Sequence, residues 1–211
     1  MLCECLTDLG SSHAWPGTAP IGVLGYDEAG MAIAIWAGSL KHRKRGRTVD
    51  IFDLLQEDHE RVCDLLRVIE ISYEPGEREE TFDEMKTELV LHSEAEENIF
   101  YRELASHEEL RDLVMECREE HKLIEQLLED MARMDSADEQ WPAKLTVLSE
   151  IVAHHVREEE KSMFRKAREA FDTDVAVELA ERFEEEKENL RGRFRVISSD
   201  AAKNPPGQPL S

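Results

Sequence analysis

Residues 92–101 (HSEAEENIFY) and 155–164 (HVREEEKSMF) share one pattern: a histidine, a glutamate four residues later, and then apolar side chains. In a helix, residues four apart lie on one face about one turn apart, so each histidine and its glutamate can reach a common point. His92 also falls between Leu89 and Ile99 on an apolar stripe with helical spacing. The repeat therefore predicts two amphipathic helices that direct the same pair of side chains into one core.

A second pair of histidines extends this repeat. His59 and His121 lie 62 residues apart, and His92 and His155 lie 63 residues apart. His59 and His121 also fall on the apolar stripes of their own segments. The repeated unit is thus a helix with one histidine followed by a helix with HxxxE, and two such halves predict a site with approximate twofold symmetry.

The two glutamates of the repeat, Glu96 and Glu159, would lie on the interior faces beside histidines. An uncompensated carboxylate in an apolar core costs several kcal/mol. Two of them need a shared positive partner, and a pair of divalent or trivalent cations supplies it. We therefore expect a metal site; one histidine alone would more often be a hydrogen-bonded core residue.

The remaining sequence predicts the fold and the domain boundaries. Seven of the ten glycines precede residue 51, and the rest of the chain is rich in Glu, Leu, Lys and Arg, which indicates helices and argues against a sandwich or barrel. We expect an all-α protein, an up-down-up-down antiparallel four-helix bundle with an extra C-terminal helix. The expected parts are a poorly ordered extension (1–48), the bundle (49–171), a C-terminal helix packed on or beside it (172–197) and a disordered tail (198–211). A translation start near Val49 would open the chain directly on the first helix.

Residues from about Asp50 to Ala170 resemble the hemerythrin HHE cation-binding family of bacterial hemerythrin-like proteins, whose pattern is H, HxxxE, H, HxxxE on four antiparallel helices. The metal ligands that this resemblance implies are His59, His92, Glu96, His121, His155 and Glu159. It implies a non-haem di-iron centre in which the first two histidines bind one iron, the last two bind the other, and both glutamates bridge. Histidine and carboxylate ligands without thiolate also suit iron, with manganese and zinc as open alternatives.

The sequence departs from the oxygen-carrying hemerythrins, which have a second histidine one turn along the third helix where this chain has Glu125. They also have HxxxxD on the fourth helix, where this chain has HxxxE. The expected function is therefore sensing, binding or buffering of iron, oxygen, nitric oxide or peroxide in a stress response. The alternative is a di-iron enzyme with peroxidase-like, catalase-like or ferroxidase-like activity, which is disfavoured because no general acid or base beyond the ligands is evident. A metal-free interaction bundle is a third possibility.

Several residues near the pattern have two interpretations. His154 has Glu158 four residues on but lies about 100° off the stripe, which places it at the surface or behind a ligand. Glu125 is expected to be solvated or to accept from a histidine N–H rather than to bind metal.

Cysteine and tyrosine side chains near the pattern are expected to be structural. Cys63 and Cys117 lie one turn from His59 and His121 and are expected to be small core residues. Tyr73 and Tyr101 are expected to be packing residues.

The formal net charge is −22, from 26 basic and 48 acidic residues. Such a charge argues against nucleic acid and against an anionic membrane surface as partners, and leaves any protein partner unspecified. No apolar window reaches the ~18 residues that a membrane-spanning helix needs, and four cysteines make no disulfide framework in a chain of this length. We expect a cytoplasmic protein.

Overall fold

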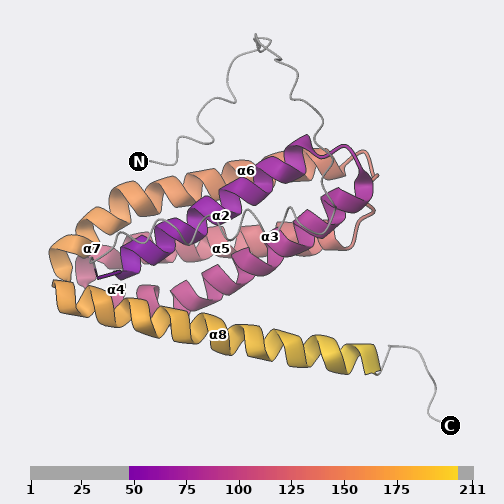
Figure 1. Ribbon diagram of the computed structural model, residues 1–211. Helices are drawn as coiled ribbons and strands as arrows, with labels where there is room; N and C mark the ends of the chain where they lie inside the picture. Colours follow the sequence, from indigo (N-terminus) through magenta and orange to yellow (C-terminus); the bar gives the residue numbers. More distant parts are fainter. Residues whose placement is uncertain (1–47, 204–211) are drawn as a thin grey trace, which may run out of the picture. The chain divides into compact units, whose positions relative to one another are not determined.

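The computed structural model describes residues 48–203, and every regular element among them is helical, which confirms the expected all-α class (Figure 1). The predicted extension (1–48, except for its last residue) and most of the predicted tail lie outside the described residues. The helices are α2 (Ile51–Ile71), α3 (Pro75–Ala95), α4 (Tyr101–Leu104), α5 (Arg111–Ala132), α6 (Trp141–Glu158), α7 (Phe164–Ala170) and α8 (Thr173–Lys203). Two π-helical turns (Glu96–Phe100 and Glu159–Met163) and a 3₁₀ turn (Glu108–Leu110) join them.

Local sequence signals account for the helix starts. The first residues of α2 follow a capping box, in which the Asp53 N–H donates to Asp50 Oδ1 at 3.0 Å and the Asp50 N–H donates to Asp53 Oδ2 at 3.3 Å. Both α3 and α6 carry a proline in the first turn, where its missing N–H costs no helical hydrogen bond. Helix α2 ends at Ile71, so Tyr73, expected to pack, is 93% exposed. That expectation was wrong because the helix terminates before its stripe reaches Tyr73.

Helices adjacent in the sequence pack together, α2 against α3 and α5 against α6, while contacts of α2 with α6 and of α3 with α5 join the two pairs. Helix α8 packs against α2 and α3 (Figure 1). It ends at Lys203, six residues beyond the boundary expected at 197. None of the helices in residues 48–203 combines the length and apolar character needed to cross a membrane.

The core consists of two clusters. The first, here called the aromatic cluster, includes Phe52, Phe100, Tyr101, Phe164 and Phe183. The second, here called the aliphatic cluster, includes Val62, Leu66, Leu89, Ile124 and Leu148.

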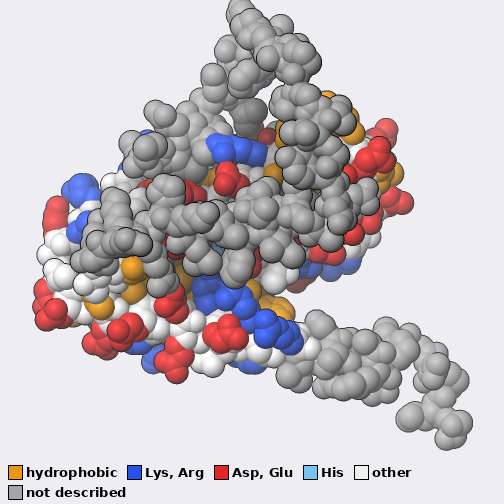
Figure 2. Space-filling model, in the orientation of Figure 1, with side chains coloured by type: hydrophobic (Ala, Val, Ile, Leu, Met, Phe, Trp, Pro, Cys, Tyr) orange, Lys and Arg blue, Asp and Glu red, His pale blue; other side chains and the backbone are white. Residues whose placement is uncertain are grey.

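The order of these clusters along the helices places the histidines at their junction. On α2, Leu55 belongs to the aromatic cluster, Val62 belongs to the aliphatic cluster, and His59 lies between them in the sequence. On α5 the same change of cluster occurs around His121. A polar layer thus divides the apolar core. The outer surface, by contrast, carries acidic side chains over much of its visible described part (Figure 2).

Candidate metal centre

The structure brings all six sequence-predicted ligands together in the buried polar layer. One group consists of His59, His92, Glu96 and Glu159, and its potential ligand atoms lie within 4.8 Å of one another. A second group consists of Glu96, His121 and His155 within the same limit. All six are buried, both glutamates completely. Because Glu96 belongs to both groups, the cluster has the form of two adjoining sites.

Each HxxxE glutamate opens a π-helical turn. The Tyr101 N–H donates to the Glu96 carbonyl and the Phe164 N–H donates to the Glu159 carbonyl, each five residues along. Such a turn contains one more residue than an α-helical turn and is often found at functional sites. Residues five positions after each glutamate therefore return to the buried face, where Tyr101 stacks on His121 and Phe164 stacks on His59. A 3.6-residue periodicity does not predict this shift.

The glutamate oxygens lie between histidines of the two groups. Glu96 Oε2 is 3.4 Å from His92 Nε2 and 3.5 Å from His121 Nε2. Glu159 Oε2 is 3.2 Å from His59 Nε2 and 3.8 Å from His155 Nε2. Each carboxylate thus faces one histidine from each half of the repeat, which is the arrangement that bridging ligands require.

Several buried atoms that face the centre lack hydrogen bonds within the protein. Five of them have no hydrogen-bond partner: His59 Nε2, His92 Nε2, both Glu96 carboxylate oxygens and Glu159 Oε2. His121 Nε2 and His155 Nε2 approach to 3.1 Å, although two unprotonated ring nitrogens repel each other. Buried polar atoms are normally satisfied, and a cation within reach of these nitrogens and oxygens would satisfy them together. The residues therefore fit a metal pair.

Each of the four histidines also contacts a carboxylate on its opposite ring nitrogen, Nδ1. His92 Nδ1 lies 3.2 Å from Asp58 Oδ2, and His155 Nδ1 lies 2.9 Å from Glu120 Oε2. Asp58 and Glu120 each immediately precede the lone histidine of their half. These two contacts are therefore equivalent under the repeat.

The other two histidines, His59 and His121, contact a second pair of equivalent carboxylates. His59 Nδ1 lies 3.0 Å from Glu160 Oε1, and His121 Nδ1 lies 3.4 Å from Glu97 Oε1. Glu97 and Glu160 each immediately follow the glutamate of HxxxE. Sequence analysis did not single out any of these four carboxylates, although their positions are repeated at the same spacing as the ligands.

These outer carboxylates determine which ring nitrogen can bind a metal. A carboxylate at Nδ1 accepts the Nδ1–H of a neutral imidazole, so the unprotonated Nε2 faces the centre. At Asp58, burial opposes ionisation, but the hydrogen bond from His92 and the charge of Lys187 outweigh it and lower the pKa from 3.8 to about 2. Asp58 is therefore an anion over the physiological range, as this role requires.

Without a metal, bound protons offset the negative charge of the buried carboxylates in the centre. Burial and the charge of Glu159 raise the pKa of Glu96 well above its usual 4.5. Burial opposes protonation of His59, but its contacts with Glu159 and Glu160 raise its pKa from 6.5 to about 9. Burial lowers the pKa of His92 to about 4, so that imidazole is neutral. The centre thus holds a proton on His59 where a metal would otherwise supply positive charge.

Tyr101 belongs to the site, which extends its expected packing role. Its hydroxyl donates to Glu159 Oε1, and its ring stacks on His121 with centroids 5.4 Å apart and an interplanar angle of 21°. Burial and the charges of Glu159 and Glu96 raise the pKa of Tyr101 well above its usual 10. The tyrosine is therefore a neutral proton donor to a bridging carboxylate. Only the π-helical turn directs it inward, so helical periodicity could not have assigned this role.

Cys117 and Cys63 are buried thiols, as expected for core residues. Cys117 lies near Glu120 and His155. Burial raises the pKa of the Cys117 thiol far above its usual 9, as do the charges of Glu159 and Glu120. A protonated thiol is a poor metal ligand, which keeps the centre a histidine and carboxylate site.

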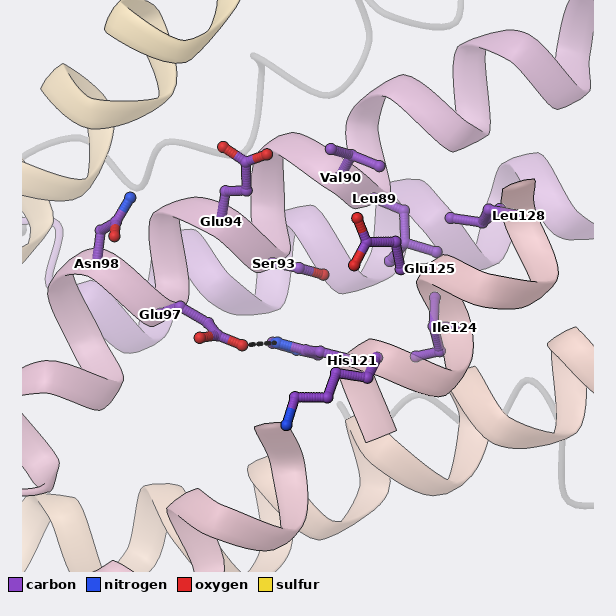
Figure 3. Close-up of a pocket in the computed structure, with 11 residues that line it drawn as sticks. Leu89, Val90, Ser93, Glu94, Glu97, Asn98, His121, Ile124, Glu125 and Leu128 are labelled. Atoms are coloured by element: carbon purple, nitrogen blue, oxygen red, sulfur yellow. Dashed lines mark ion pairs between the residues drawn. The ribbon is translucent and has the colours of Figure 1, made fainter. Parts of the chain in front are cut away.

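The two ambiguous residues lie outside the ligand cluster. His154 is half exposed, and its Nε2 lies 3.2 Å from Glu120 Oε1, so it contacts the outer partner of His155. Glu125 is exposed and lines a pocket of about 460 Å³ between α3 and α5 (Figure 3). In this pocket the Glu97 carboxylate points at the His121 ring, so one wall of the pocket reaches the back of a candidate ligand (Figure 3).

The fold and the site define a class of protein, a helical bundle with a buried histidine and carboxylate centre that can hold cations. The sequence matches the family described as "Hemerythrin HHE cation binding domain" over residues 50–167. The chain therefore belongs to the hemerythrin HHE cation-binding family, as the sequence resemblance indicated.

Individual proteins show more distant similarity. One solved structure, a hemerythrin HHE cation binding domain-containing protein from Mycobacterium kansasii, matches with a TM-score of 0.61 and 23% identity, covering 74% of this chain and 94% of that one. This likeness concerns the fold. A DNA nickase from Nostoc sp. is 26% identical over 146 residues, or 69% of this chain. The chain spans only 41% of the length of that nickase.

Proposed function

We propose that this protein is a non-haem di-iron protein that binds or senses a small ligand, such as oxygen, nitric oxide or peroxide, or that buffers iron. The observation that carries the proposal is the set of buried, inward-facing nitrogens and oxygens without hydrogen bonds on His59, His92, Glu96 and Glu159. In this proposal His59 and His92 would hold one iron and His121 and His155 would hold the other. Glu96 and Glu159 would be shared by the two, which agrees with the position of each carboxylate between histidines of both halves.

The chain's own residues would prepare the centre for this role. Bound iron would supply a redox-active Lewis acid that can bind a small ligand. Three outer carboxylates hold the Nδ1–H groups of His59, His92 and His155, and Glu97 lies 3.4 Å from His121 Nδ1, so that the Nε2 atoms face the centre. The two apolar clusters on either side exclude bulk water. The pocket beside His121 is the approach that we propose for a small ligand.

The helix contacts support the remaining structural details of the proposal. The pairwise packing of sequential helices agrees with an up-down-up-down antiparallel order, in which short links join helices that run in opposite directions. We also propose that the bundle proper comprises residues 49–171 and that α8 covers its α2–α3 face.

A second candidate function is a di-iron enzyme that breaks down peroxide or oxidises ferrous iron. Tyr101 favours it, because a buried hydroxyl that donates to Glu159 is a proton donor beside the centre. Binding and sensing remain our preferred function because the other titratable groups of the centre are ligands or their Nδ1 partners. A net charge of −22 opposes binding to DNA phosphates, which argues against a nickase activity for this chain.

Metal analysis of untagged protein, reconstituted anaerobically with ferrous iron, tests the proposal. Wild-type protein should bind about two irons per chain, as four histidines and two bridging carboxylates provide for, and His155→Ala should bind fewer. His107→Ala is the matched control, because this histidine contacts Phe171 and lies outside the ligand cluster, so it should leave the iron content unchanged. Folded wild-type protein that binds no metal would refute both candidate functions.

Peroxide turnover separates the two candidates. If the protein is an enzyme, the loaded form should consume peroxide faster than an equal amount of free iron, and Tyr101→Phe should reduce that rate without lowering the iron content. If the loaded protein only binds its ligand, its optical spectrum should change on exposure to oxygen, nitric oxide or peroxide without repeated turnover.

A further inference from the structure

Helix α8 contributes a buried lysine to the surroundings of the metal centre. Lys187 is only 7% exposed, and its Nζ lies 2.7 Å from each of the two Asp58 carboxylate oxygens. Lys187 and Asp58 are 129 residues apart in the sequence. The same Asp58 carboxylate contacts His92 Nδ1 through Oδ2. A continuous path of polar contacts therefore leads from α8 through Asp58 to one of the candidate ligands.

Glu88 of α3 and other residues of α8 lie around this lysine. Glu88 Oε2 lies 4.0 Å from Lys187 Nζ and 3.5 Å from Arg191 Nη2. The Phe183 ring lies one turn earlier on α8 and packs edge-on to the His92 ring at 6.3 Å between centroids. A buried ammonium group requires such paired carboxylates. Lys187 is thus held by two carboxylates, with an aromatic side chain of its own helix against the ligand that Asp58 orients.

The other three outer carboxylates have no comparable partner among the described residues. Glu97 lies 3.6 Å from Arg118 Nε, but both side chains are 37% exposed, so solvent screens that pair. Glu120 meets the half-exposed His154. Glu160 contacts His59, and no lysine or arginine is paired with it in the described part of the chain. The buried, two-oxygen contact of Lys187 therefore distinguishes the His59–His92 side from the His121–His155 side.

We propose that Lys187 is a positioning residue for the metal position formed by His59 and His92, so that α8 is part of the metal centre. The proposal rests on the metal-binding function proposed above. Lys187 fixes both oxygens of Asp58, and the fixed carboxylate holds the His92 ring with Nε2 toward the metal. Since loss of an outer partner of a ligand commonly weakens metal binding about 10–100-fold, removing Lys187 should weaken this position and spare the other. Lys187 lies outside the family match at 50–167.

Anaerobic titration with Co²⁺, followed by its visible absorption, tests the proposal because the two positions can be resolved as separate binding steps. Lys187→Met should weaken one step about tenfold or more and change its absorption band, while the other step keeps its wild-type affinity and spectrum. Arg193→Met is the matched control: it removes an exposed cation of α8 that is paired with Glu186, and both steps should stay as in wild type. Lys187→Arg should recover part of the lost affinity.

A double-mutant cycle with Asp58→Asn guards against a variant that only damages folding. Asp58→Asn alone should weaken the same step, and Lys187→Met should add little in that background because both act through one carboxylate. Equal weakening of both steps, unchanged affinity in Lys187→Met, or full additivity in the cycle would each overturn the proposal. Wild-type protein that binds no cobalt or iron would instead overturn the metal-binding function itself, and the two failures are thereby distinguished.

Discussion

Glu96→Gln should stabilise the metal-free protein while it removes the response to metal. Glu96 is fully buried, and both of its carboxylate oxygens lack hydrogen bonds. Burial and the charge of Glu159 raise its pKa well above 4.5, so ionisation of Glu96 disfavours the metal-free fold. Taking an ionised carboxylate out of water costs several kcal/mol, whereas a buried neutral amide without a hydrogen bond costs about 1–3 kcal/mol. We therefore expect Glu96→Gln to raise the free energy of unfolding at neutral pH by about 1–2 kcal/mol.

The sign of this effect depends on pH. A carboxyl group whose pKa is raised in the fold binds more protons in the folded state than in the unfolded state, so stability falls as the pH rises above the unfolded value. Below pH 4.5 the carboxyl group is protonated in both states. The advantage of Glu96→Gln should therefore be small in acid and grow as the pH rises above 4.5.

The assay is thermal or denaturant unfolding of the metal-free and iron-loaded forms. A metal at one hundred times its dissociation constant should add about 2.7 kcal/mol per site to the wild-type stability, and Glu96→Gln should lose most of this increment because Glu96 is shared by both groups. Glu94→Gln, an exposed position on the same helix, should change neither quantity. A Glu96→Gln protein that is less stable without metal, or that keeps the full increment with metal, would refute the reasoning.

Three further predictions concern the same structure. Metal loading at pH 7–8 should release about one proton from His59, as measured by calorimetry in buffers of different ionisation enthalpy. The raised pKa of His59 should stabilise the metal-free fold by roughly 3 kcal/mol below pH 6.5. This stabilisation should disappear as the pH rises through about 9. Denaturant titrations should show the loss in metal-free protein and no such loss in metal-loaded protein. Among core residues, Phe183→Ala should cost about 3–5 kcal/mol, whereas Phe194→Ala, at a position 37% exposed, should cost far less in the same unfolding assay.

The sequence indicated the helical class, the metal-binding family and the six inward-facing residues, because these depend on local spacing. An i, i+4 pair shares a helix face whatever surrounds it. The repeated spacing of the histidines then indicated that the buried faces of the four helices place their histidines in one layer of the bundle. Domain boundaries were less accessible, since α8 continues to Lys203 and its end depends on contacts and local propensity rather than on a sharp stop signal.

The sequence did not predict which carboxylates contact the Nδ1 atoms of the ligand histidines. Asp58, Glu97, Glu120 and Glu160 occur among many acidic residues, and no local pattern shows which of them reach a histidine on another helix. Their contacts depend on how adjacent helices are rotated and staggered when the core packs. The π-helical turns were also not predicted from the sequence. One additional residue per turn changes which side chains face inward, and it places the Tyr101 hydroxyl where it donates to Glu159.

The sequence by itself thus determined which side chains would share a face, since helical periodicity is a property of the local chain. Only the tertiary structure decided what lies behind each ligand, since that depends on contacts between helices distant in the sequence. Lys187 shows the difference most clearly. In the sequence it is one charged residue in a Glu-rich helix, and in the fold it is a buried cation that joins α8 to Asp58 and, through it, to His92.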